Sequence, residues 1–313
     1  MRSRPWLPYV VLLGGVSVAS TAAIMITSLI GEGVGLLAIA TGRLGFAALI
    51  LTPIALAKSR DELRRLSRRE IGLALLSGVF LAIHFAAWIS SLAFTSVASS
   101  TALVTTNPIF VALVSWLIWR ERLGRVALIG IALSFLGSLL IALSDRSGGS
   151  GSSPLLGDFL ALVGALFVTG YLLAGRELRR HMHILPYIWL VYSTAAVILL
   201  LWMVIAGQTL LGFPPHVYLL LVALAVGPQL LGHTSFNWSI KYLSATFVAV
   251  AILGEPISST VLALILLPNQ QLQALQLAGG IVLMLGITVA TLAERGDERR
   301  IKIERELQEV AAP

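Results

Sequence analysis

The sequence contains no cysteine and few charged residues. Only 12% of its 313 residues are charged, and 15 are acidic. The absence of cysteine excludes disulfides, thiol catalysis and thiolate metal sites, and it leaves the redox compartment undetermined. The low charge, together with 57% hydrophobic residues and a mean hydropathy of +0.91, lies far outside the averages of soluble domains. The composition therefore predicts a membrane protein.

The sequence motifs of soluble enzymes are also missing. There is no HExxH zinc motif, no GxSxG nucleophile motif, no Walker motif and no dinucleotide-binding fingerprint. We therefore expect no enzymatic activity, no metal ion and no cofactor, and no ATP-driven transport by this chain itself. The net charge of +7 does not indicate a nucleic-acid partner, because the basic residues lie in short segments between apolar runs.

The apolar residues form blocks of about 20, and each block is long enough to cross a hydrocarbon core of about 30 Å as an α-helix. A transmembrane β-barrel would instead show alternating segments of about 10 residues. The predicted fold class is an all-α polytopic membrane protein with ten transmembrane helices. The predicted spans are residues 8–30, 33–57, 71–93, 97–119, 124–143, 155–174, 185–207, 216–238, 242–267 and 272–293.

Lysine and arginine are distributed unevenly between the two sides of this bundle. With the N-terminus inside, 20 of the 22 basic residues fall on the inner side, Arg146 falls outside and Arg43 lies within a span. The positive-inside rule then places both termini in the cytoplasm. We expect a multi-pass protein of the bacterial inner membrane that is surrounded by lipid and acts as a monomer.

A Gly/Ser-rich segment, residues 144–154, divides the ten spans into five and five. We expect residues 1–143 to form one repeat and residues 155–293 a second. The charged tail, residues 294–313, is expected to be a solvated or frayed helix.

The two halves align with each other over two spans. Asn107-Pro108 falls on Glu255-Pro256 at an offset of 148 residues, and Gly137 falls on Gly286 at 149. Because five spans are an odd number, the second repeat must enter the membrane in the opposite orientation. Inverted repeats are a recurring plan of secondary transporters, in which two halves open a central site to alternate sides.

Two charged residues lie deep within predicted spans. Arg43 is about 15 Å into the second span by helical rise, and Glu255 lies near the middle of the ninth. An ionised group at this depth is costly unless it is paired or faces water. One interpretation is a structural Arg43–Glu255 ion pair. The other is that Glu255 faces a water-filled cavity and binds a substrate ammonium or carries a proton, which Pro256 favours by freeing a backbone carbonyl.

Polar residues recur on equivalent helices of the two halves. His84 and Trp88 share one face of the third span, and Gln229, His233 and Asn237 share one face of the eighth. At an offset of 149 residues His84 falls on His233 and Trp88 on Asn237. A central pocket would need this placement, and Trp88 would stack on an aromatic or cationic substrate. A histidine in a membrane helix is also often a hydrogen-bond partner of a neighbouring helix, so both interpretations stay open.

The segment "TTNPIFVALVSWLIWRERLGRVALIGIALSFLGSLLIAL" resembles the end of the first EamA repeat of the drug/metabolite transporter superfamily. It has a proline in the fourth span, Glu121 at the cytoplasmic end of that span and a Gly-rich fifth span. "ATGRLGFAALIL" is similar to the second span of that family, with Arg43 in the usual place, and Glu255-Pro256 resembles the ninth. The second repeat departs from the family pattern, since Asn269 stands opposite Glu121.

The resemblance implies an exporter of amino acids or similar small metabolites that works by alternating access, with the proton as a candidate coupling ion. Spans 1, 3, 4, 6, 8 and 9 would line the cavity, with spans 1 and 6 assigned by the resemblance alone. A multidrug or cation exporter on the same fold, and a membrane-embedded enzyme or lipid-handling protein, remain alternatives. The candidate substrate-binding or coupling residues are Glu255, His84, Trp88, His233, Gln229, Asn237, Asn107, Arg43 and Tyr171.

Overall fold

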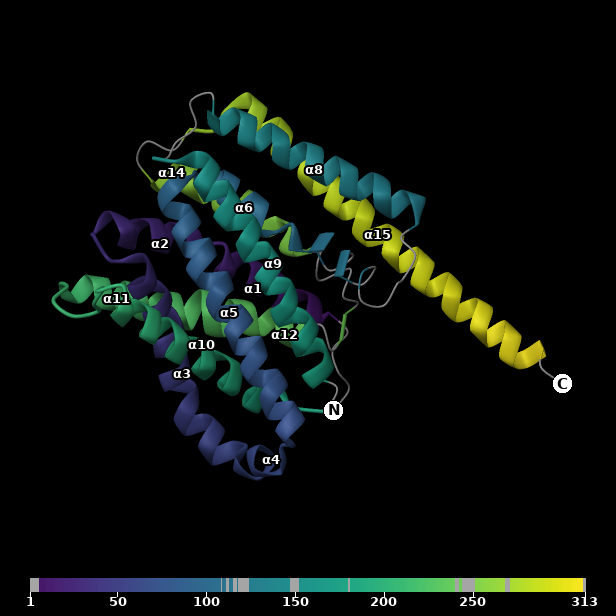
Figure 1. Ribbon diagram of the computed structural model, residues 1–313, viewed down its shortest axis with the longest axis horizontal. Coiled ribbons are helices and arrows are strands. Elements are labelled where there is room, and N and C mark those ends of the chain that lie inside the picture. The colour runs from purple at the N-terminus through teal and green to yellow at the C-terminus, as the bar shows by residue number, and fades with distance from the viewer. Residues whose placement is uncertain are drawn as a thin grey trace.

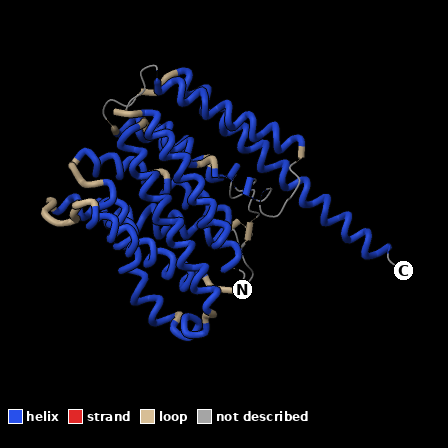
Figure 2. Tube along the Cα trace, in the orientation of Figure 1, coloured by secondary structure: helices blue, strands red, loops and turns tan. Residues whose placement is uncertain are grey.

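The computed structural model describes residues 6–107, 109–110, 113–114, 117, 124–146, 152–179, 181–239, 242–243, 251–267 and 271–311. Every regular element in these ranges is a helix (Figure 2), so the all-α prediction is confirmed. The helices are α1 (Leu7–Ala19), α2 (Ala22–Gly31), α3 (Leu36–Lys58), α4 (Arg60–Arg65), α5 (Arg68–Phe94), α6 (Val97–Val104), α8 (Arg125–Arg146), α9 (Pro154–Leu178), α10 (Ile184–Ile205), α11 (Pro215–Leu224), the π-helix η1 (Ala225–His233), α12 (Thr234–Ser239), α14 (Gly254–Leu266) and α15 (Ala274–Ala311).

The helices account for the predicted membrane spans. Among the described residues, six helical segments are long and apolar enough to cross a membrane: Leu7–Gly31, Leu36–Lys58, Arg68–Phe94, Pro154–Leu178, Ile184–Ile205 and Pro215–Ser239. Shorter apolar stretches lie within α8, α14 and α15. Of the predicted span 97–119, α6 forms the first part. Pro108, Glu121 and Asn269, and residues 147–151 of the predicted linker, lie outside the described residues.

The first predicted span is broken into α1 and α2. At the break, the Ser20 hydroxyl donates to the carbonyl of Val16 and the Thr21 hydroxyl to that of Val18. The Ser20 carbonyl accepts a hydrogen bond of 2.9 Å from the hydroxyl of Ser259 on α14. Side-chain bonds of this kind compete with the helical ladder and bend helices. The junction therefore lies where the two repeats touch.

The eighth predicted span is not a uniform α-helix. Between α11 and α12 the chain widens into η1, which contains Pro228. Proline has no backbone N–H and cannot make the regular bond at this position. A π-helical segment satisfies the backbone with a wider turn, and such segments are frequent at functional sites. Gln229 and His233, both predicted site residues, lie on this segment.

The ninth predicted span is interrupted at Leu253. Residues 251–252 are helical, and helix α14 begins again at Gly254, so Glu255 and Pro256 lie in its first turn. Proline tolerates this position because it has no backbone N–H to leave without a helical partner. The free carbonyl that Pro256 predicts near residue 252 stays a prediction.

The packing of the helices follows a two-fold relation between the repeats. Helices α3 and α10, the second and seventh spans, pack on each other, as do α8 and α15, the fifth and tenth. The third span, α5, packs on the sixth, α9, and the equivalent contact of the eighth span with the first is made by η1 and α1. When the two repeats are exchanged, each of these contacts is therefore mapped either onto itself or onto another of them. The two-repeat membrane fold is confirmed. The largest hydrophobic core cluster is shared by α2, α3, α5, α9 and α10.

Helices α8 and α15 lie side by side along one edge of the molecule (Figure 1), in close backbone contact. A Cβ atom on Gly137 would fall within 3.0 Å of the backbone of Leu283, and one on Gly286 within 3.0 Å of the backbone of Ser134. Small residues that allow such close approach are typical of membrane helix pairs. Helix α15 continues beyond α8 to Ala311 (Figure 1), so residues 294–311 of the predicted tail are helical.

Helices α3 and α10 are joined at both ends. At one end the side-chain carbonyl of Gln208, just after α10, accepts hydrogen bonds from the backbone N–H groups of Leu37 and Ala38 at 2.9 and 3.1 Å. At the other end, Glu62 on α4, which follows α3, accepts a bond of 2.7 Å from the backbone N–H of His183, the N-cap of α10, and lies 2.9 Å from its ring Nδ1. Helix N-termini carry unsatisfied donors and partial positive charge. Gln208 satisfies two such donors, and Glu62 satisfies one and adds a negative charge.

Candidate functional site: a buried polar cluster between the repeats

Arg43 is the largest fully buried side chain of the protein's described part, with 0% of its surface exposed. Its Nε donates a hydrogen bond of 2.8 Å to the side-chain carbonyl of Gln229 on η1, which is itself fully buried. The guanidinium carbon lies 4.2 Å from the centre of the Phe85 ring and 5.6 Å from that of Trp88. Aromatic faces attract a guanidinium and shield it from water. Three helices, α3, α5 and η1, thus hold one cation.

Arg43 and Glu255 are not joined by an ion pair. Among the described residues no carboxylate oxygen lies within 4.0 Å of the Arg43 guanidinium, although the charge of Glu255 is near enough to act on it. Both Nη1 and Nη2 of Arg43 are buried without a hydrogen-bond partner in the described part of the chain. Glu255 is partly exposed. The structure therefore does not show the ion-pair interpretation, and a water-filled cavity at Glu255 stays a prediction.

His84 is held by a neighbouring helix. Its Nδ1 lies 2.8 Å from the carbonyl of Gly164 on α9, and since a carbonyl only accepts, Nδ1 carries the proton. The imidazole is 5% exposed and stacks on the Trp88 indole, with centroids 6.2 Å apart and planes at 8°. Gly164 allows α9 to approach, because a Cβ there would lie 3.3 Å from Trp88. The predicted His84–Trp88 face therefore exists, and its histidine has a structural partner.

His233 has a different environment. It is partly exposed, and its ring lies 5.7 Å from the rings of both Phe85 and Phe236. The charge of Arg43 acts on it, which places it beside the same cluster. No side-chain hydrogen bond of His233 is present within the described residues. Of the two predicted histidines, His233 is the one whose ring nitrogens remain available.

Asn237 and Tyr171 form a second group. The Asn237 amide donates to the Tyr171 hydroxyl at 2.9 Å and to the carbonyl of His233 at 2.9 Å. The Tyr171 ring stacks on that of Tyr187, with centroids 6.4 Å apart. Tyr192, also on α10, lies against Gln229. The two groups are therefore contiguous through η1 and α10.

Asn107 makes no side-chain hydrogen bond to this cluster within the described residues. Its backbone carbonyl accepts a bond of 3.2 Å from the Thr169 hydroxyl, and its side chain is partly exposed. Asn107 and Glu255 are aligned in the sequence, but the contacts of Asn107 do not reveal a shared role. A role of Asn107 in substrate binding stays a prediction.

Sequence reasoning missed three aromatic residues of the site: Phe85 next to Arg43, Tyr192 next to Gln229, and Tyr187 next to Tyr171. For Tyr192 a signal was present. It follows Arg43 by 149 residues, the offset that relates the two repeats, so it is the seventh-span equivalent of the buried arginine. Phe85 and Tyr187 carry no such signal, because aromatic residues are common throughout apolar spans.

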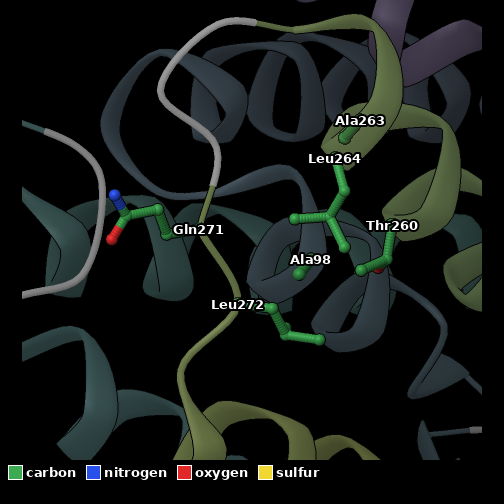
Figure 3. A pocket seen from close by; sticks show the side chains of 6 residues that line it. All are labelled: Ala98, Thr260, Ala263, Leu264, Gln271 and Leu272. Atoms are coloured by element: carbon green, nitrogen blue, oxygen red, sulfur yellow. The ribbon is translucent and has the colours of Figure 1, made fainter.

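Two cavities among the described residues lie away from this cluster. Figure 3 shows a pocket of about 10 Å³, the size of one water molecule, lined by Ala98, Thr260, Ala263, Leu264, Gln271 and Leu272. An open groove of about 300 Å³ between α14 and α15 is lined by apolar residues and Thr288. Neither includes a predicted site residue. Within the described residues, no group of three His, Asp or Glu residues converges on a possible metal site.

Comparison with known proteins identifies the fold and the class. The model of the EamA-like transporter family matches residues 6–143 and again residues 155–292. The chain belongs to the EamA-like transporter family. It is a multi-pass membrane protein and a transporter, not an enzyme.

Relatives of this EamA-like transporter are transporters of several bacteria. An uncharacterized transporter of Clostridium kluyveri is 24% identical over 225 residues, which cover 70% of this chain and 72% of that protein. The pseudopaline exporter CntI of Pseudomonas aeruginosa, strain UCBPP-PA14, is 29% identical over 187 residues, covering 59% of this chain and 63% of the exporter. A solved crystal structure matches with a TM-score of 0.62 at 21% identity, covering 94% of this chain and 99% of that one, which shows the fold alone.

Proposed function

We propose that this EamA-like transporter exports amino acids or related small metabolites across the bacterial inner membrane. It works by alternating access between its two inverted five-helix repeats, with both termini in the cytoplasm. The excess of Lys and Arg on one side of the spans supports the orientation. One relative carries the name of an exporter, which supports the direction of transport.

The buried Arg43 beside an unpaired Glu255 carries this proposal. The two charges come from different repeats, on α3 and α14, and no ion pair joins them within the described residues. An uncompensated charge at membrane depth is costly and marks a substrate or ion pathway. Two opposite charges that do not neutralise each other suit a substrate with both an anionic and a cationic group. A free amino acid has both groups.

The other residues have distinct parts in this scheme. Glu255 and His233 are partly exposed and can contact a substrate or exchange a proton. Trp88 is 4% exposed and stacks on His84, so it shapes the wall of the site. The break between α1 and α2 and the π-helix η1 provide places where the helices can bend as the repeats move.

The direct test is counterflow into proteoliposomes preloaded with single unlabelled amino acids, with labelled amino acids outside, with and without a pH gradient. Saturable exchange is expected with some amino acids. The substitution Glu255→Gln is expected to abolish exchange, or to abolish the response of exchange to the pH gradient, without unfolding the protein. Glu32→Gln, which changes a carboxylate that is 48% exposed, is the matched control. No exchange by folded wild-type protein across the panel would refute the amino-acid assignment.

A multidrug or cation exporter is the second candidate, because a carboxylate such as Glu255 and an aromatic face such as that of Trp88 would each attract a cation. Cationic dyes that compete with amino acids for counterflow would favour it. Since Arg43 would repel such dyes, we expect weak competition or none.

A further inference from the structure

Four of the unpartnered polar atoms around Arg43 are nitrogen donors, and a fifth, the hydroxyl of Tyr192 beside Gln229, can donate as well as accept. Arg43 Nη1 and Nη2, Gln229 Nε2 and Trp88 Nε1 are buried, and none has a hydrogen-bond partner within the described residues. Arg43 and Gln229 are 0% exposed and Trp88 is 4% exposed. Each of these atoms is a nitrogen that donates and does not accept. The site therefore offers hydrogen-bond donors and one positive charge.

These unpartnered donors indicate which chemical group on a ligand would satisfy them. A buried donor without a partner costs free energy, and a buried charge without a partner costs more. The group that best satisfies four N–H donors and a cation is an anion that only accepts hydrogen bonds. An ionised carboxylate has two oxygens with about four acceptor sites, and it meets a guanidinium with two parallel bonds.

The hydrogen bond of Arg43 leaves the edge of its guanidinium that carries Nη1 and Nη2 available for a carboxylate. Its Nε donates to the Gln229 carbonyl at 2.8 Å, which fixes the plane of the group. The Nη1–Nη2 edge then remains for a two-point contact. The rings of Phe85 and Trp88, 4.2 and 5.6 Å from the guanidinium carbon, hold the group from the side. With its carbonyl engaged, Gln229 can offer only its amide N–H groups to a third partner.

We propose that Arg43, Gln229 and Trp88 bind a carboxylate of the transported molecule, an inference that rests on the proposed function. Arg43 supplies the charge and two parallel hydrogen bonds, and the Gln229 amide and Trp88 indole supply further donors. Because Arg43 is fully buried, the carboxylate reaches it when the repeats move apart. Glu255 is then left for the cationic end of the same molecule. Substrates without a carboxylate are rejected, since they leave the buried donors unpaired.

The test compares ligands that differ only in this group. Purified full-length protein is titrated with phenylacetate and with phenylacetamide at equal ionic strength, and thermal unfolding is measured. The same comparison is made in counterflow with each transported amino acid and its carboxamide. The acid is expected to bind at least about tenfold more tightly than the amide, as for hydrogen bonds to a charged group.

Variants of Arg43 and Trp88 test whether these two residues produce the preference. Arg43→Gln is expected to remove the preference for acid over amide, and Arg43→Lys to keep part of it, because lysine has the charge without the planar fork. Trp88→Phe removes the indole N–H and keeps a ring, so the preference is reduced. Arg179→Gln is the matched control, because Arg179 lies at the end of α9 and donates to the Met182 carbonyl. It is expected to behave as wild type.

The outcomes separate this inference from the proposed function. Exchange of amino acids with equal competition by their carboxamides would leave the exporter proposal standing and overturn the carboxylate site. Stabilisation by phenylacetate that depends on Arg43, without exchange of any amino acid, would support the site and refute the amino-acid assignment. A preference for acid that persists in Arg43→Gln would overturn the inference. If Arg43→Gln does not fold, Arg43→Lys, Trp88→Phe and the wild-type ligand pair decide it.

Discussion

Arg43 on α3 and Tyr192 on α10 occupy equivalent positions in the two repeats, 149 residues apart, and both lie against Gln229. The fold is built on an approximate two-fold relation, but the side chains at its centre do not follow it. One repeat contributes a cation, and the other contributes a neutral phenol at the same place. A site with this asymmetry can distinguish the two ends of a substrate although its scaffold is nearly symmetric.

The close contact of α8 and α15 predicts that alanine substitutions at two glycines of α15 differ strongly in their effect on stability. A Cβ on Gly286 would fall within 3.0 Å of the Ser134 backbone, whereas one on Gly280 meets no atom within 4 Å among the described residues. Gly286→Ala is expected to destabilise the protein by roughly 1–3 kcal/mol, because backbones cannot move as side chains can. Gly280→Ala, the control, is expected to be neutral or stabilising by up to about 1 kcal/mol. Thermal unfolding in detergent measures both, and equal effects would contradict the packing.

Gln208 caps the N-terminus of α3, so we expect its replacement to lower the stability of the protein although it lies outside the spans. Gln208→Leu leaves the N–H groups of Leu37 and Ala38 without their shared acceptor. We expect a loss of about 1–2 kcal/mol of stability, as for other helix caps. Gln271→Leu changes an exposed glutamine and is the control. If thermal unfolding is unchanged in Gln208→Leu, the cap makes no contribution.

The joined ends of α3 and α10 predict that the two helices move as one unit. The pair is held by Glu62 and His183 at one end, by Gln208 at the other, and by a bond of 3.0 Å from the Trp189 indole to the Thr52 hydroxyl between them. A short cross-link between Glu62→Cys and His183→Cys is therefore expected to preserve counterflow. The protein has no cysteine of its own, so the pair reacts without background.

The single-cysteine variants, treated with the same reagent, are the control for this cross-link. Loss of counterflow only in the cross-linked double variant would show that α4, which follows α3, separates from the start of α10 during transport.

The two histidines are expected to respond differently to substitution. His84 donates from Nδ1 to the Gly164 carbonyl, and an asparagine amide can replace that donor. His84→Asn is therefore expected to keep transport and its dependence on pH. His233 has no such bond and is partly exposed, so His233→Gln is expected to alter the pH dependence of counterflow. Initial rates over a range of pH compare the two variants, and a pH profile changed only by His84→Asn would reverse these roles.

The membrane class, the spans and the repeat were predictable because they depend on local properties of the chain. Apolar blocks of about 20 residues, Gly137 aligned with Gly286, and uneven basic residues are visible without knowledge of any contact. The bends were less visible. The break at Ser20 coincides with a bond from Ser259, which is 239 residues away, and the start of α14 at Gly254 placed Pro256 in a first turn.

Hydropathy, charge distribution and periodicity are local properties of the chain, so they sufficed to predict a ten-span, two-repeat membrane transporter and a short set of polar residues inside it. They could not predict which of these residues meet. In the structure Arg43 bonds to Gln229 and not to Glu255, and Asn107 accepts a bond from Thr169 through its backbone carbonyl. A side chain's partner depends on how helices rotate and cross, and packing over the whole bundle sets those angles.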